Sequence, residues 1–145
     1  MITVSAIVQG AIDRVQACLP ERMKASVMRW PDKPEQFTPA VLRASHPHGA
    51  LLVKHLESTG NGGAEVVIVG VGVVAETSLR EEALAEAVRA YLNRYQVPGL
   101  TRYEFATDKQ LEIEFGIICR TVAFSCNRPA VPAADIAAVN AALGV

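Results

Sequence analysis

The stretch AEVVIVGVGVVA, residues 64–75, is an almost wholly apolar, β-branched run with no charged residue between Glu65 and Glu76. This composition is typical of a strand that is buried on both faces in the middle of a sheet. Successive side chains of a strand point to opposite faces. One predicted face carries Val67, Val69, Val71, Val73 and Ala75, and the other carries Val66, Ile68, Gly70, Gly72 and Val74. The two glycines predict a trough on the second face, which would admit a close helix, a bend or a bulge.

Gly70, Gly72 and Ala75 also match the G-x-G-x-x-G/A phosphate-binding fingerprint. In a dinucleotide-binding fold the glycines form the turn and the helix begins among them. Here two more valines prolong the apolar run, and the helix signal comes later, where Ser78 and Glu81 form a capping box. We therefore interpret the glycines as part of a central strand and predict no dinucleotide site.

Length and composition indicate one globular domain, because the chain has 145 residues of which 50% are hydrophobic. A net charge of −1 and a pI near 6.3 give no general attraction to nucleic acid or to anionic membrane. The odd set of Cys18, Cys119 and Cys126 has no C-x-x-C spacing and favours free thiols in a reducing compartment. No window approaches the ~18 apolar residues that span a bilayer, and we expect a protein made in the cytoplasm.

The first half of the chain predicts a helix, a short strand, a loop and a hairpin. Apolar spacings of three and four mark an amphipathic helix from Val4 to Leu19, before Pro20. Residues 24–30 read as a short strand, and the prolines in residues 31–49 predict a loop with at most a turn of helix at 39–44. The strand 50–57 and the loop 58–63, which contains Asn61-Gly62, predict a tight reversal into the central strand.

The second half predicts a helix and a second hairpin. The buried stripe of the helix that opens at Ser78 consists of Leu84, Val88, Tyr91 and Leu92. After Pro98-Gly99, residues 100–107 and 111–126 read as a long hairpin whose turn lies either at Asp108-Lys109 or at residues 114–116.

Two prolines in residues 128–132 predict that the chain leaves the sheet there as an extended connector. An alanine-rich segment follows at 133–143, with Ile136, Val139 and Leu143 on one side. The predicted fold class is α+β: a mostly antiparallel sheet of about five strands, two main helices packed against it, and a C-terminal helical arm. The predicted division is a domain at residues 1–127 and an arm at 128–145.

No set of residues in the sequence has the spacing of a catalytic or metal site. His46 and His48 flank a proline, with His55 on the following strand, but no cysteine or carboxylate lies at ligand spacing with them. Glu112 and Glu114 share a strand face, which suits a solvated edge as well as an acid/base pair. Ser45, Ser125, Cys119 and Cys126 lack the context of a nucleophile. We predict no catalytic residue, no cofactor and no metal.

The order of elements resembles a known family. The order resembles that of the small tail proteins of Mu-like phages and prophages. The elements that carry the resemblance are an N-terminal helix, a proline-rich loop ending in His46-Pro47-His48-Gly49, the strand starting ALLV at residue 50, the strand 66–74, the helix 79–95, Pro98-Gly99 and a closing hairpin. Those proteins are similar in layout to the tail terminators of long-tailed phages. The resemblance covers about residues 1–125, and the C-terminal segment departs from it.

The resemblance implies a function in assembly. It implies an α+β subunit in a homohexameric ring that caps the finished tail tube, stops its polymerisation and presents a surface for head-to-tail joining. The implied partners are further copies, the major tail tube protein and a head-tail connector or neck protein. DNA would pass through the ring without sequence-specific binding. The implied location is the tail or neck of the virion. The alternatives are another neck or minor tail component, a small cytosolic ligand-binding domain, or an enzyme.

Two expectations concern subunit contacts. The second hairpin carries Arg102, Glu104 and Arg120 among aromatic residues, and we expect it to contact a neighbouring subunit, with Tyr103 and Phe105 as candidate anchors. The C-terminal arm either folds back on its own subunit or docks on an adjacent subunit or another tail protein.

Overall fold

The run at residues 64–75 forms the central strand β3 (Ala64–Val74) of a five-stranded sheet in the computed structural model. The structure describes residues 2–31, 38–61, 63–97, 102–113, 117–129, 137, 140–141 and 143–144. The other strands are β1 (Val27–Arg29), β2 (Ala50–Asn61), β4 (Glu104–Ile113) and β5 (Ile117–Pro129). Their order across the sheet is β1-β2-β3-β5-β4, which puts β3 between two long neighbours.

The sheet is mixed but mostly antiparallel. β3 pairs antiparallel with β2 and with β5, and β4 pairs antiparallel with β5. Only the three-residue β1 runs parallel to its neighbour β2. The predicted α+β fold class is therefore confirmed.

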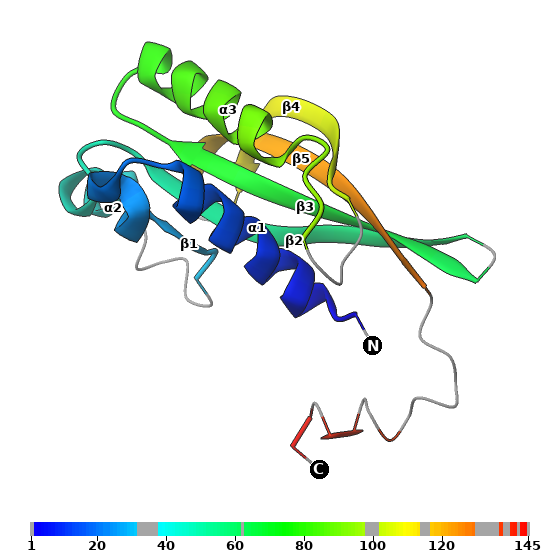
Figure 1. Ribbon diagram of the computed structural model, residues 1–145. Helices are drawn as coiled ribbons and strands as arrows, with labels where there is room; N and C mark the ends of the chain where they lie inside the picture. Colours follow the sequence, from blue (N-terminus) through cyan, green and yellow to red (C-terminus); the bar gives the residue numbers. More distant parts are fainter. Residues whose placement is uncertain are drawn as a thin grey trace.

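Two helices cover one face of this sheet, α1 (Val4–Cys18) and α3 (Ser78–Leu92), as Figure 1 shows. The face of β3 that carries Val67, Val69, Val71 and Val73 lies beneath them, and all four side chains are fully buried. Fully burying such a side chain contributes about 1.5–3 kcal/mol. From the helices this core includes Ile7, Ala11, Val15, Leu84, Val88 and Leu92. Most of the predicted stripe of α3 is confirmed, although Tyr91 is only partly buried.

Among the described residues, only one end of the opposite face of the sheet is covered. There the short helix α2 (Pro39–Ser45) places Leu42 in a small cluster with Ala50, Leu52 and Val74. Met28 and Trp30 pack against the margin of this cluster. We call this second face of the sheet the open face.

The predicted strand at residues 24–30 is only half correct. Glu21–Ser26 form the 3-10 helix η1, in which the N–H of Met23 donates to the Pro20 carbonyl. The buried Met23 and the side chain of Gln16, which donates to the Lys24 carbonyl, hold this turn against α1. Tertiary contacts thus replace the alternation that the sequence suggested, and the strand starts at Val27.

Both hairpins form, and the structure fixes their lengths. β2 continues to Asn61, four residues beyond the predicted end at Glu57, and Asn61 pairs with Ala64. The β2–β3 hairpin therefore extends past α1, as seen at the right of Figure 1. In the second hairpin Asp108 and Lys109 pair with Val122 and Thr121 on β5. The predicted turn at Asp108-Lys109 is therefore wrong, and the other predicted position, residues 114–116, lies outside the described residues.

The start of α3 and the end of β5 also differ from the prediction. The N-cap of α3 is Thr77, whose hydroxyl accepts from the Arg80 N–H at 3.1 Å, so the predicted cap Ser78 is the first helical residue. β5 runs through Arg128 to Pro129, which pairs with Ala64, although the chain was predicted to leave the sheet at Arg128. Pro129 is tolerated because it is the last residue of its strand. Most of the predicted arm lies outside the described residues.

Candidate assembly surface

A β-bulge in β2 shapes the open face. His55 pairs with Val69 and Glu57 with Ile68, so Leu56 is an extra residue without a partner on β3. Its side chain lies over Gly70, where an added Cβ would stand 2.7 Å from the Leu56 Cδ1. The trough predicted from the glycines is therefore real at Gly70. It is filled by a side chain from the neighbouring strand, and the bulge lies in β2 rather than in β3.

A second bulge lies on the other side of the sheet, in β4. Phe105 pairs with Phe124 and Thr107 with Ala123, which leaves Ala106 as the extra residue. Between the two bulges the open face is hollowed by a cavity of about 380 Å³. Its apolar lining consists of Leu56, Ile68, Ala106 and Ala123, and its polar lining of Glu57, Thr107 and Lys109. We call this feature the bulge hollow.

Leu56 is the residue of this surface that sequence reasoning missed. It remains 37% exposed although it packs on Gly70, and it is one of the few large apolar side chains exposed among the described residues. The sequence offers one signal, because Leu56 is an isolated apolar residue between His55 and Glu57 in an otherwise polar stretch. Its position over Gly70 depends on the register of β2 against β3, which the sequence does not state.

A tryptophan lies farther along the open face. The Lys54 ammonium lies 5.7 Å from the centre of the Trp30 ring, a cation–π contact. The indole Nε1 is buried and has no hydrogen-bond partner within the described part of the chain. The Trp30 backbone N–H donates to the Val53 carbonyl at 2.9 Å and so extends the pairing of β1 with β2 by one bond.

The outer edge of β2 is unpaired over most of its length. β1 pairs only with Leu51 to Val53, so no described strand lies beside β2 from Lys54 to Asn61. The Val53 carbonyl points to this edge because it accepts from Trp30. Backbone groups of an antiparallel strand alternate in direction, and the bulge shifts the alternation by one residue. The N–H groups of His55, Ser58 and Gly60 therefore point outward.

The outer edge of β4 is unpaired in the same way. Near the start of β4 one N–H on this edge has a partner, because the Asn93 side-chain oxygen accepts from the Phe105 N–H at 3.1 Å. The Phe105 N–H thus points outward, and after the bulge the same alternation directs the N–H groups of Asp108 and Gln110 outward. No described strand pairs with this edge. The sheet therefore has an open edge on each side.

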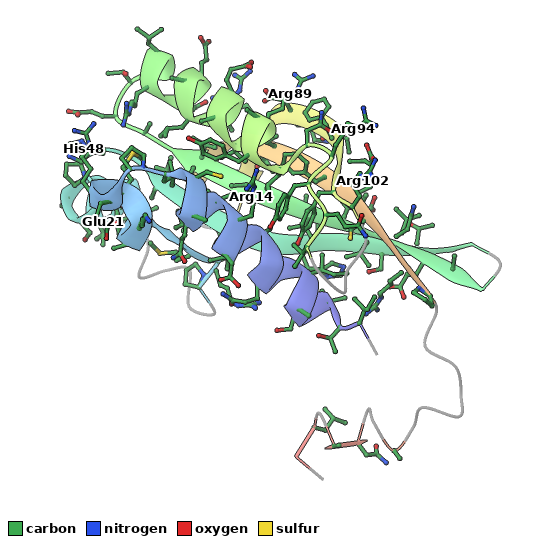
Figure 2. All side chains as sticks on the ribbon, viewed as in Figure 1. Arg14, Glu21, His48, Arg89, Arg94 and Arg102 are labelled. Carbon is green, nitrogen blue, oxygen red and sulfur yellow. The ribbon has the colours of Figure 1, made fainter. Side chains whose placement is uncertain are left out.

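Arginines gather around the C-terminal end of α3. Figure 2 shows Arg89, Arg94 and Arg102 near one another there. Arg89 stacks on Phe105 at 3.8 Å from the ring centre, and Arg94 has a positive φ of 65°. On the other side of the same helix end, the Arg14 guanidinium donates to the Tyr91 carbonyl at 3.0 Å. Cations near the C-terminal end of a helix stabilise it through the helix dipole. The arginines can therefore be explained as helix-stabilising residues, and we do not infer an anion-binding site from them.

Of the two predicted subunit anchors, Tyr103 lies in the subunit's own core, so the expectation is wrong for this residue, whereas for the partly buried Phe105 it stays a prediction. Tyr103 is fully buried, its hydroxyl donates to the Ile7 carbonyl of α1, and burial raises its pKa well above the ordinary value. Phe105 packs edge-on against Phe124 with ring centres 6.2 Å apart. Tyr103 is thus covered by α1, and Phe105 is partly covered by Arg89 of α3.

The three histidines are dispersed. His46 Nδ1 is 2.9 Å from the Ser26 hydroxyl, and His55 Nε2 is 2.8 Å from the Ser58 hydroxyl. The carbonyl of His48 accepts from Arg80, and Figure 2 shows its side chain at the end of the molecule near α2. Among the residues that the structure describes, no group of three or more His, Cys, Asp or Glu is placed to hold a metal.

The other candidate residues lie apart from one another. Gly70 and Gly72 are paired strand residues opposite Lys54 and Leu52, and α3 begins only at Ser78. Ser45 ends α2, while Ser125 pairs with Ile68 on β3. Cys18 carries a free thiol and Cys126 is buried in the core. The side chains of Cys119, Glu112 and Glu114 lie outside the described residues.

An ion pair lies close to the turn of the projecting β2–β3 hairpin. Arg128 contacts Glu65 at 3.1 Å and also donates to the Ile2 carbonyl at 2.8 Å, which ties β5 and β3 to the N-terminus. Hydrogen bonds from Arg128, and then from Ser58, lower the pKa of Glu65. This contact explains why β5 continues through Arg128.

Comparison with models of known protein families and with curated proteins finds no match for this chain. Among the described helices, none combines the length and the apolar character needed to cross a membrane. The surface features from which a function can be inferred are thus the two open edges and the bulge hollow.

Proposed function

We propose that the protein is a structural subunit that assembles head to tail into a ring, and that this ring is a phage tail terminator. The observation that carries the proposal is the pair of open strand edges on opposite sides of one sheet. A strand edge with unpaired N–H and carbonyl groups is a template for pairing with another chain.

The directions of the strands suit this mode of association. Three antiparallel pairings separate β2 from β4, so these two strands run in opposite directions. When copies repeat side by side in one orientation, the β4 edge of one copy meets the β2 edge of the next as an antiparallel pair. Such a head-to-tail contact uses two different surfaces, and it closes into a ring when the rotation between copies allows. The bulges increase the local twist and so favour rotation between copies.

The specific role rests on the resemblance in element order. As a tail terminator the ring, a homohexamer, would cap the tail tube, stop its polymerisation and present the surface for a head-tail connector or neck protein. Such a part of the virion tail, made in the host cytoplasm, requires no catalytic residue, cofactor or metal. Another neck or minor tail component with the same ring architecture is the nearest alternative.

The mass distribution of the purified full chain across a concentration series tests the ring. We expect closed oligomers of one size. Gln110→Pro removes an outward N–H without breaking the pairing of β4 with β5, and should raise the concentration at which rings form by about tenfold or more. Gln110→Ala, which keeps the N–H, is the matched control.

Bulges in edge strands can also serve to prevent pairing with other chains. If that is their role here, the chain stays monomeric at every concentration, and this result would contradict the proposal. Added rings should also shorten tail tubes assembled in vitro from the major tube protein, and rings that leave tube length unchanged would contradict the terminator role while preserving the ring.

The bulge hollow favours a second candidate function, that of a small ligand-binding domain. Its volume of about 380 Å³ falls in the range of small-molecule sites. A thermal-shift screen with nucleotides and metabolites detects such a ligand, because binding to the folded state raises the melting temperature.

A further inference from the structure

The bulge hollow is a partly apolar depression on the open face of the subunit. Leu56, Ile68, Ala106 and Ala123 provide its apolar surface. Leu56 is 37% exposed, and Ile68 is partly buried. Within the described residues, the helices α1 and α3 contact the other face of the sheet, and α2 packs near Val74 at one end.

The C-terminal segment, residues 130–145, has the complementary character. Its sequence AVPAADIAAVNAALGV contains a single charged residue, Asp135. Leu143 is 71% exposed, and Ala137, Asn140 and Ala141 are exposed as well. The sequence from 133 to 143 places Ile136, Val139 and Leu143 on one side of a helix of ~11 residues, which is marginal in water without a surface to pack on.

We propose that the bulge hollow receives the C-terminal segment of a second copy, so that neighbouring copies exchange arms. The arm's apolar stripe fills the hollow beside Leu56, and Asp135 lies near Lys109, which lines it, or near Lys54 on the same face. This inference rests on the proposed function only in requiring that copies associate.

The position of the arm's root supports an occupant from a second copy. β5 ends at Pro129, opposite Ala64 at the base of the hairpin turn. The hollow lies at the level of Ala123, six residues back along β5, or about 20 Å away. The exposed Leu143 shows that the subunit's own hollow does not bury it. At ~3.3 Å per residue, the 16 residues from 130 to 145 are long enough to reach either their own hollow or that of an adjacent copy, and the exposed Leu143 favours the adjacent copy.

Photo-crosslinking of the full chain tests the proposal. A benzophenone amino acid replaces Leu143, and the protein is prepared as a mixture of ¹⁴N-labelled and ¹⁵N-labelled copies. After irradiation, mass spectrometry of the crosslinked peptides shows both the acceptor residue and whether the two peptides come from different copies. We expect mixed-isotope adducts to β2 around Leu56 and to β4 around Ala106.

Leu56→Ser should lower the yield of these adducts roughly tenfold. Leu79→Ser is the matched control, because Leu79 is 78% exposed on α3 and lies outside the hollow, and it should leave the yield unchanged. Adducts within single-isotope chains only, adducts at other surfaces, or an equal loss in both variants would overturn the inference.

The masses of the crosslinked species separate this inference from the ring proposal. Mixed-isotope adducts at the hollow in dimers that never close into rings support arm exchange and contradict the ring. Rings without adducts at the hollow support the ring and contradict arm exchange. A small molecule that copurifies with the protein and is displaced by Leu56→Ser would also contradict arm exchange.

Discussion

At the scale of single residues, the contact between Leu56 and Gly70 connects the sequence to the shape of the open face. Gly70 has no side chain, and an added Cβ would meet Leu56 Cδ1 at 2.7 Å and Thr121 Cγ2 at 3.1 Å. A side chain at position 70 would therefore force Leu56 to move.

A double-mutant cycle tests this contact. Gly70→Ala should lower the free energy of unfolding by about 1 kcal/mol, because the new methyl group overpacks against Leu56. In a Leu56→Ala background the same substitution should cost much less, giving a coupling of about 0.5–1 kcal/mol in urea unfolding. Additive effects of the two substitutions would mean that Leu56 does not occupy the position over Gly70.

A second glycine is required by its backbone conformation. Gly49 has a φ of +111°, which L side chains rarely adopt, and an added Cβ would stand 2.5 Å from Leu84 Cδ1. It joins α2 to β2 directly beneath α3. The end of the His46-Pro47-His48-Gly49 motif is thus explained by a tight turn whose last residue, Gly49, is buried.

At the scale of elements, the cap of α3 decides where the helix begins. The Thr77 hydroxyl accepts from the Arg80 N–H, and the Glu81 N–H donates to the Thr77 carbonyl. Ser78 also carries a hydroxyl that could cap a helix, but it is already the first residue of α3.

Thr77→Ala should therefore lower the free energy of unfolding by about 1 kcal/mol, the usual cost of losing an N-cap side chain. Ser78→Ala is the matched control and should stay within about 0.5 kcal/mol of wild type, since it only changes an exposed first-turn residue. Chemical denaturation of the three proteins measures both effects. If Ser78→Ala lowered the free energy of unfolding more than Thr77→Ala does, Ser78 would be the N-cap, as the sequence suggested.

At the scale of the whole molecule, the two open edges predict a pattern of amide exchange. The outward N–H groups of His55, Ser58 and Gly60 on β2, and of Asp108 and Gln110 on β4, should exchange quickly in dilute subunits. In assembled rings they should become protected, because they then donate to the neighbouring copy. Hydrogen exchange followed by mass spectrometry or NMR at two concentrations measures the difference.

The amides of β3 serve as the internal control, because β2 and β5 pair with both of its edges and protection should be high in both states. Protection that rises at the open face residues but not at the two edges would indicate association through the face alone. The ring proposal would then need a different interface.

Local patterns in the sequence were enough to predict the central strand, the two main helices and the two hairpins. β-branched runs, spacings of three and four, and Asn61-Gly62 act within a few residues of one another. The prediction missed the cap at Thr77, since Ser78 one residue later has equivalent chemistry.

The features that shape the candidate surface depend on packing between segments that are far apart in the sequence. The bulges at Leu56 and Ala106 depend on the register between strands, which is fixed by the sum of packing across the whole sheet rather than by local pattern. The same packing places Tyr103 beneath the helices, where the sequence suggested a subunit anchor. An alternating strand has two faces, and the sequence of that strand alone does not state which one the rest of the chain will cover.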